Sequence, residues 1–171
     1  LNAIRLSFMK KFLLPFLAVL AIPASVNAGY TSDVDLMTDE TKIRITHNSI
    51  TKVSNSIGVQ EPATIVIRCD FKNDKTINLD AYIKTPTYNT DNNKVGLRWD
   101  SGEPIRTSWN ESTSGTALFN PNPKKFINKL LESNTLVFQW SPYQSVSKAV
   151  KFDLIQMKTD IIQAKTDGCE Y

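Results

Sequence analysis

Side chains that could carry out chemistry are few in this chain, which has a single histidine, His47, and two cysteines, Cys69 and Cys169. Catalysis by a Ser-His-Asp set would need His47 as its base, and the sequence has no G-x-S-x-G turn to present a serine. A zinc site needs four ligands. One histidine and two cysteines are too few to supply them, and the cysteines cannot bind zinc if they are oxidised to a disulfide. His47 lies late in an alternating segment, so we interpret it as a surface residue of a strand.

The most polar and aromatic stretch is RWDSGEP, over 98–104. An exposed Trp99 flanked by Arg98, Asp100 and Glu103 has a composition typical of a binding surface. The alternative is an ordinary alternating strand, in which Trp99 packs inward while Arg98 and Asp100 face solvent. Asp100 and Glu103 could also serve as the paired carboxylates of a glycosidase, although nothing in the sequence fixes their separation.

Three further polar features are candidates for binding or for local structure. Tyr143 lies in the loop SPYQ, where we expect it to be exposed and available for binding. Asp153 could be a general acid or base, but before a helix its carboxylate is more simply a helix cap. The loop NTDNN, over 89–93, has oxygen ligands that calcium uses and lacks the glycine and bidentate acid of an EF-hand loop. We expect no catalytic residue, no metal and no cofactor.

The two cysteines are expected to form a disulfide bond. Cys69 lies in TIVIRCDF, which is typical of a buried strand, and Cys169 follows a helix pattern. The start of the sequence, described next, indicates an exported domain, and two cysteines in such a domain usually pair. Closing so long a loop would stabilise the fold by about 4–5 kcal/mol. The alternatives are two free thiols or one reactive thiol activated by His47.

A secretory signal of bacterial type accounts for the start of the sequence. Residues 9–28, MKKFLLPFLAVLAIPASVNA, begin at Met9 with two lysines, continue with an apolar run and end on small residues. The alternative is a transmembrane helix, but the run is about half the ~20 residues that a span requires. We therefore expect translation to start at Met9 and cleavage to follow Ala28. The mature chain would reach the periplasm or the exterior of a Gram-negative bacterium without inserting into the membrane.

Removal of residues 1–28 changes the charge of the molecule. They hold three of the 20 Lys and Arg residues and none of the 17 Asp and Glu residues, so the mature chain would carry 17 of each and no formal net charge. A basic footprint for nucleic acid is therefore missing, and we expect no nucleic-acid partner. We interpret the lysines of NPKK and KAVK as solvated faces.

The elements that would position these residues follow from periodicity. Residues 29–41 are polar and acidic and are interpreted as a loose N-terminal arm, followed by a single domain over 42–171. Alternating patterns predict strands at 42–54, 63–71, 76–85, 94–100, 105–110, 116–120, 135–140 and 145–154. Helical spacing predicts a helix from Pro123, capped by Asn122, and another from Leu154 that ends at Gly168.

This order of elements predicts the α+β class. Short strands separated by frequent turns indicate an antiparallel β-sandwich or barrel-like sheet, to which one mid-chain helix and a C-terminal helix are added. An all-β fold with incidental helical turns is the alternative. Trp109 and Trp140 are candidates for its core.

With these elements in order, the chain resembles the VasI/TagO family of exported proteins, which are associated with type VI secretion and have phage and prophage relatives. The resemblance covers residues 65–169, through RCDF, the RWD strand, FINKLLESNTLVFQW and AVKFDLIQMKTDIIQAKTDGC. The matching positions are Cys69, Arg98, Asp100, Phe126, Leu130, Leu131, Leu136, Phe152, Asp153, Leu154 and Cys169. The family usually has a glycine after its A-x-F-D-L segment, where this chain has IQM.

The resemblance implies an exported accessory role without catalytic residues. We therefore expect a periplasmic binding protein that contacts an envelope or secretion-system protein. The alternative is a phage- or prophage-encoded envelope factor that excludes a second phage or inhibits an envelope enzyme. An envelope hydrolase is the third hypothesis.

Overall fold

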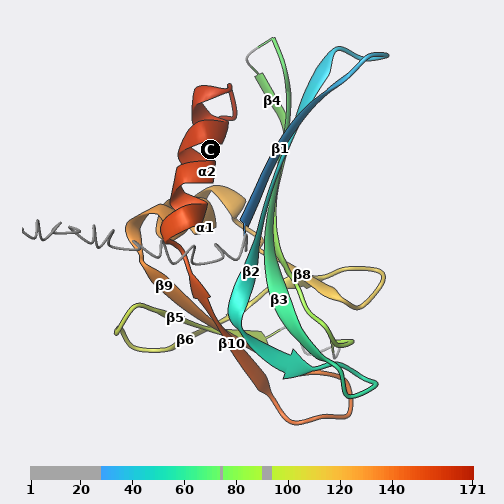
Figure 1. Cartoon of the computed structure of the whole chain (residues 1–171), viewed down its shortest axis with the longest axis vertical. Helices are drawn as coiled ribbons and strands as arrows, with labels where there is room; N and C mark the ends of the chain where they lie inside the picture. The colour runs from blue at the N-terminus through green and yellow to red at the C-terminus, as the bar shows by residue number, and fades with distance from the viewer. Residues whose placement is uncertain (1–27, 74, 90–93) are drawn as a thin grey trace, which may run out of the picture.

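The computed structural model describes residues 28–73, 75–89 and 94–171. The predicted signal segment lies outside these residues except for Ala28, and so does most of the calcium-loop candidate at 89–93. Within the described residues the chain forms two antiparallel sheets and two helices (Figure 1).

The larger sheet has the strand order β1-β2-β3-β4-β8-β7. Its long strands are β1 (Ala28–Asp35), β2 (Glu40–Ser54), β3 (Gln60–Lys72) and β4 (Lys75–Lys84), and its short ones are β7 (Asn110–Glu111) and β8 (Ala117–Phe119). The strands predicted at 63–71 and 76–85 form a hairpin, in which β3 and β4 pair in antiparallel register with Ile65 opposite Ile83. A register shift between Asp70 and Phe71 leaves Ile77 without a partner on β3, and the Ile77 side chain is exposed.

The smaller sheet has the order β10-β9-β5-β6. It consists of β5 (Lys94–Trp99), β6 (Ile105–Ser108), β9 (Thr135–Trp140) and β10 (Lys148–Asp153). Alternate residues of β9 and β10 are buried, as their sequence pattern predicts. The strand predicted over 145–154 starts later in the structure, since Val146 precedes β10 in a loop and is exposed.

Helix α1 (Pro123–Glu132) begins as its sequence predicts. Asn122 is the N-cap, and its side-chain Oδ1 accepts a hydrogen bond from the amide of Lys125 at 3.1 Å. Phe126, Ile127 and Leu130 form its buried face.

Helix α2 (Ile155–Thr166) lies where helical spacing predicts a helix. Met157, Ile161 and Ala164 are buried at helical spacing, whereas Ile155 and Ile162 are exposed. The two isoleucines fall outside the stripe that faces the sheet, since residues separated by four and three positions share one face of a helix.

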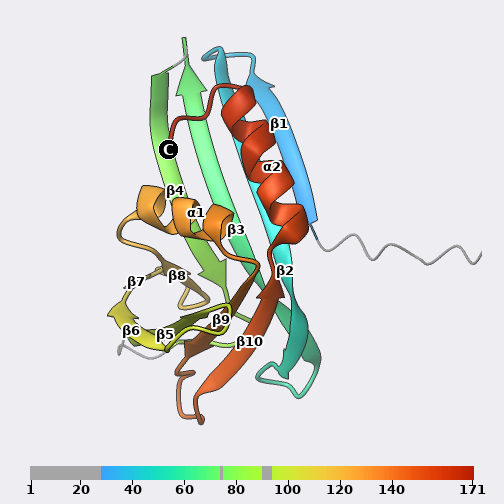
Figure 2. The same ribbon diagram turned by 90° about the vertical axis from the view of Figure 1, so that its left-hand side faces the viewer.

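Both helices and the smaller sheet lie against the same side of the long sheet, the helices along its upper part and the smaller sheet below them (Figure 2). The core lies between these layers. Its large side chains include Trp140 of β9 and Trp109, which lies between β6 and β7, and each of the two is 1% exposed. The prediction that both tryptophans belong to the core is therefore confirmed.

His47 lies in this interior rather than on the surface. Its side chain is 4% exposed, and its Nε2 hydrogen-bonds the main-chain oxygen of Asp153 on β10. The surface assignment is wrong because the alternation that buries Ile43 and Ile45 also places His47 on the inner face of β2, which β10 covers.

The predicted loose arm is also wrong. Residues from Ala28 to Asp35 form β1, which pairs along its whole length with β2. The Tyr30 hydroxyl donates to the carboxylate of Asp167, just beyond α2, and burial is the main reason that the pKa of Tyr30 rises to about 12. The segment is therefore an edge strand, and acidic side chains are common on such strands.

The predicted disulfide is confirmed. Cys69 on β3 is bonded to Cys169, which lies 100 positions further along the chain, and their Cα atoms are 6.1 Å apart. Gly168 brings the chain to this bond at φ 111°, and a Cβ there would lie 2.8 Å from Cε2 of Phe71. Only glycine fits both the conformation and the contact.

Candidate functional site

The predicted binding stretch does not form one surface. Arg98 is exposed on the outer face of β5, whereas Trp99 points to the opposite face and packs on Phe126 of α1, with ring centroids 5.7 Å apart. Successive residues of a strand point to opposite faces, so the two side chains cannot contact one ligand from the same side.

Asp100 supports the fold. It adopts φ 49° at the end of β5, and its Oδ1 accepts hydrogen bonds from the amides of Asn134 and Thr135, each at 2.8 Å. These bonds favour the ionised carboxylate and hold the pKa of Asp100 below its usual value. Asp100 therefore fixes the turn between α1 and β9 to the end of β5.

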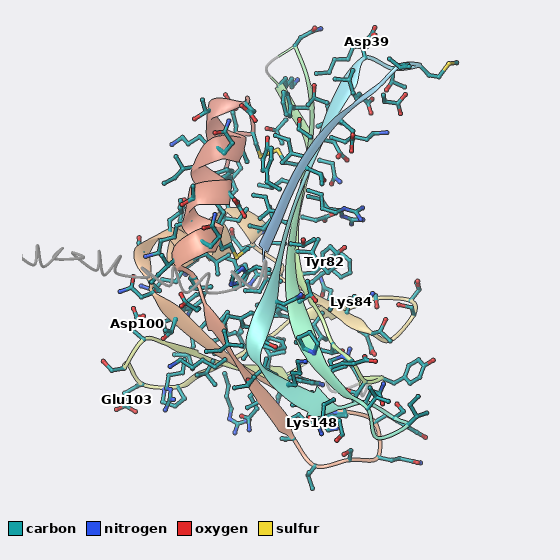
Figure 3. All side chains as sticks on the ribbon, in the orientation of Figure 1. Asp39, Tyr82, Lys84, Asp100, Glu103 and Lys148 are labelled. Carbon is teal, nitrogen blue, oxygen red and sulfur yellow. A yellow bond between two sulfur atoms is a disulfide. The ribbon has the colours of Figure 1, made fainter. Side chains whose placement is uncertain are left out.

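Glu103 and Tyr143 lie at separate places. Glu103 is exposed in the turn between β5 and β6, near Asp100 but pointing to solvent (Figure 3). Tyr143 is 62% exposed beyond the far end of β9, where its amide donates to the main-chain oxygen of Tyr88 at 2.8 Å. The length of β9 separates Tyr143 from the turn that holds Asp100, so these residues do not converge.

Asp153 has a capping role, shifted by one residue from the predicted one. Leu154 is the N-cap of α2 and has no side chain suited to it. The Asp153 carboxylate accepts from the amide of Ile155, the first helical residue, at 3.0 Å. The position before the cap thus supplies the acceptor that the cap residue lacks.

A groove lies between α1 and the β5–β6 edge of the smaller sheet. Its volume is about 820 Å³. Leu97, Trp99 and Phe126 contribute to its floor, and Ile105 and Thr107 of β6 line one side. Trp99 is thus the only one of the predicted binding residues that lines this groove among the described residues.

The opposite wall of the groove is basic. Lys124, Lys125 and Lys129 of α1 line it, with Glu132 as the only acidic lining residue in the described part of the chain. Lys129 pairs with Glu132 at 3.1 Å, whereas no ion pair of the described residues involves Lys124 or Lys125. The first turn of a helix adds partial positive charge beside these two lysines. The groove therefore combines an aromatic floor with a cationic wall.

Sequence reasoning missed this groove because it interpreted the lysines of NPKK as a solvated face. The helix pattern did indicate that Lys124, Lys125 and Lys129 lie opposite the buried Phe126 and Ile127. The approach of β6 to that polar face is a tertiary contact, and no local pattern encodes it.

The described residues form neither a metal-binding cluster nor a membrane-spanning helix. No three His, Cys, Asp or Glu side chains gather there as a metal site would require. None of the helices described is both long enough and apolar enough to cross a membrane.

Comparison with known proteins informs the fold alone. No protein-family model matches the chain, and no curated protein matches it. Among solved structures, the chain is similar to the invasion associated protein B of Bartonella henselae, with a TM-score of 0.50 and 10% sequence identity. The match covers 82% of this chain and 94% of that one, so nearly the whole described architecture has a counterpart.

Proposed function

We propose that the chain is an exported binding protein of the bacterial envelope, and that the groove between α1 and β6 is its binding site. The observation that carries this proposal is the groove itself, because an aromatic floor beside two unpaired lysines is a surface suited to a ligand. Trp99 would supply the apolar contact, while Lys124 and Lys125 would select for negative charge.

The disulfide supports the exported location. Structural disulfides persist in oxidising compartments, and Cys69–Cys169 joins a core strand to the segment after the last helix. The proposal keeps the signal peptide, cleavage after Ala28 and delivery to the periplasm or the exterior as its premises.

Binding rather than catalysis is favoured by the roles of the titratable candidates. The Asp100 carboxylate is engaged by two main-chain amides, and the His47 ring is buried against the main chain of Asp153. Each of these side chains has a structural partner, which makes the hydrolase hypothesis the weaker one.

We also infer that the two sheets face each other as an open β-sandwich and that the chain shares the VasI/TagO architecture. In support, several positions that carry the resemblance are structural: Cys69 and Cys169 are bonded, Asp100 fixes a turn, and Phe152 and Leu154 are buried. The partner inferred from this architecture is an envelope or secretion-system protein.

The test is site-specific photo-crosslinking in intact cells of the native host. A photoreactive residue at Asn128, exposed on the groove wall, is compared with one at Lys151, which is exposed on β10. Strand β10 is the edge of the smaller sheet opposite β6, which borders the groove. We expect a discrete adduct from position 128 that disappears in the charge-reversed variant K124E/K125E, and none from position 151. Equal adducts from both positions, or none from position 128, would contradict the proposal.

A further inference from the structure

The two edges of the smaller sheet differ in how they are covered. Side chains of β2 cover the β10 edge: Thr51 Oγ1 accepts from the amide of Lys151 at 2.8 Å, and His47 hydrogen-bonds the oxygen of Asp153. At the other edge, β6 pairs with β5 alone in the described part of the chain. An edge strand presents main-chain donors and acceptors that can pair with another strand.

The inner face of β6 is also incompletely covered. Ile105 and Thr107 stand opposite Leu97 and Val95, which are both buried, so all four side chains point to the core side of the sheet. Ile105 is nevertheless 51% exposed, because the groove lies beside it. An inward-facing isoleucine left half in water marks a place where a further apolar side chain would be buried.

Helix α1 runs along the other side of this opening and determines the charge that fits it. A strand added to β6 would place every second side chain on the core side, facing Lys124, Lys125 and Lys129. The three lysines and Glu132 leave the lining with two net positive charges. Carboxylates on those inward positions would complement this wall, together with an apolar residue against Trp99.

We propose that the groove captures an extended acidic segment of a partner protein, which adds as a strand to β6. The main chain of the segment pairs with the open edge, and its inward side chains are acidic near Lys124 and Lys125 and apolar near Ile105 and Trp99. This inference rests on the proposed function and specifies the chemistry of the partner. β6 has four residues, so main-chain pairing is short and the side-chain contacts provide much of the selectivity.

Other occupants fit these features less well. A second copy of this chain pairing through β6 would bring two basic α1 helices together, which like charges oppose. The edge strand β1 of the larger sheet carries Asp33 and Asp35, and such charges discourage pairing with an acidic segment. An anionic lipid or a phosphorylated glycan would match the lysines but would make no use of the open main chain of β6.

The experiment selects displayed random dodecapeptides on the purified, oxidised protein, with K124E/K125E as the counter-selection target. The matched control is K52E/K151E, which reverses two exposed lysines on β2 and β10, away from the groove. We expect enriched peptides to alternate acidic and apolar residues, and we expect K52E/K151E but not K124E/K125E to bind them. Equal melting temperatures for the three proteins establish that the variants fold.

Main-chain pairing is then tested with N-methylated versions of the best enriched peptide. Because alternate residues of an added strand point their N–H groups to β6, methylating one set of alternate residues should weaken binding at least tenfold. Methylating the other set should be tolerated. Anionic vesicles of phosphatidylglycerol serve as the competing ligand and should not displace the peptide.

Three outcomes would overturn the inference. They are the absence of acidic residues among enriched peptides, equal tolerance of both methylated sets, and binding of the vesicles through Lys124 and Lys125 in place of peptide. If any of these occurs while the crosslink from position 128 still depends on the two lysines, the proposed binding function stands and only the acidic strand is excluded. If the protein with intact lysines gives no crosslink from position 128, the proposed function itself is excluded.

Discussion

Asp100 and His47 are both titratable residues whose side chains hydrogen-bond main-chain groups of other strands. The Asp100 carboxylate receives two amides from the start of β9, and the His47 ring meets a carbonyl of β10. The residue types alone suggested chemistry, whereas their partners show that they join separate segments of the fold. Partners distant in sequence could not have been identified from local patterns.

The burial of His47 makes the stability of the protein depend on pH. Burial lowers the pKa of His47 below its ordinary value of 6.5 because the charged ring is poorly solvated there. The unfolded chain therefore takes up a proton at a higher pH than the folded chain does. The stabilisation is complete above the unfolded pKa and is lost as the pH falls below about 6.5 toward the lower folded value.

We accordingly expect the free energy of unfolding of the wild-type protein to fall between pH 7.5 and pH 5. His47→Gln should fall less over the same range, since its amide can still donate to Asp153 but does not titrate. Urea unfolding at several pH values measures the difference between the two proteins. A difference that does not change with pH would mean that His47 is not held as a neutral, buried ring.

At the scale of elements, periodicity predicted most of what the structure contains. The β3–β4 hairpin, the Asn122 cap of α1 and the strand-to-helix passage at Asp153 all follow from local patterns that the structure reproduces. The face of α2 did not follow, because Ile155 and Ile162 are apolar yet point away from the sheet. Apolar residues on both sides of a helix leave its orientation to tertiary packing.

The groove illustrates the same limit. Sequence reasoning singled out Trp99 for binding and assigned the lysines of α1 to solvent, and the structure brings both to one hollow. Two elements 20–30 positions apart meet there because α1 follows β8 in the larger sheet and then crosses toward the smaller one. Such a crossing is a property of topology and not of any one segment.

The disulfide should determine whether α2 stays against the sheet. Replacing Cys169 with serine opens a loop of 100 positions, which the chain-entropy model converts into about 4–5 kcal/mol of lost stability. We expect a lower urea midpoint and earlier proteolytic cleavage near α2. Wild-type protein treated with reductant is the control and should behave like the variant. Unchanged unfolding and digestion would contradict the role assigned to this bond.

At the scale of the whole molecule, the layers share one core but differ in what holds them. Both helices and the smaller sheet cover one side of the larger sheet (Figure 2). The covalent bond joins β3 of the larger sheet to Cys169, just beyond α2. The bond encloses part of β3 and every later element, whereas β1 and β2 lie outside it. The hairpin formed by β1 and β2 is thus held by hydrogen bonds and packing alone.

This asymmetry has a mechanical consequence. A pulling force applied between residues 28 and 171 can extend only the residues before Cys69 and the last two, because the Cys69–Cys169 bond carries the load past everything between them. At about 3.4 Å per residue, the oxidised protein should lengthen by roughly 140 Å, and the 100 positions inside the bond should add about 340 Å only after reduction. Single-molecule force spectroscopy with and without reductant measures both steps, and full extension of the oxidised chain would exclude this behaviour. A machine that threads the protein from its N-terminal side would therefore meet this bond at Cys69, after β1, β2 and most of β3 had been stripped away.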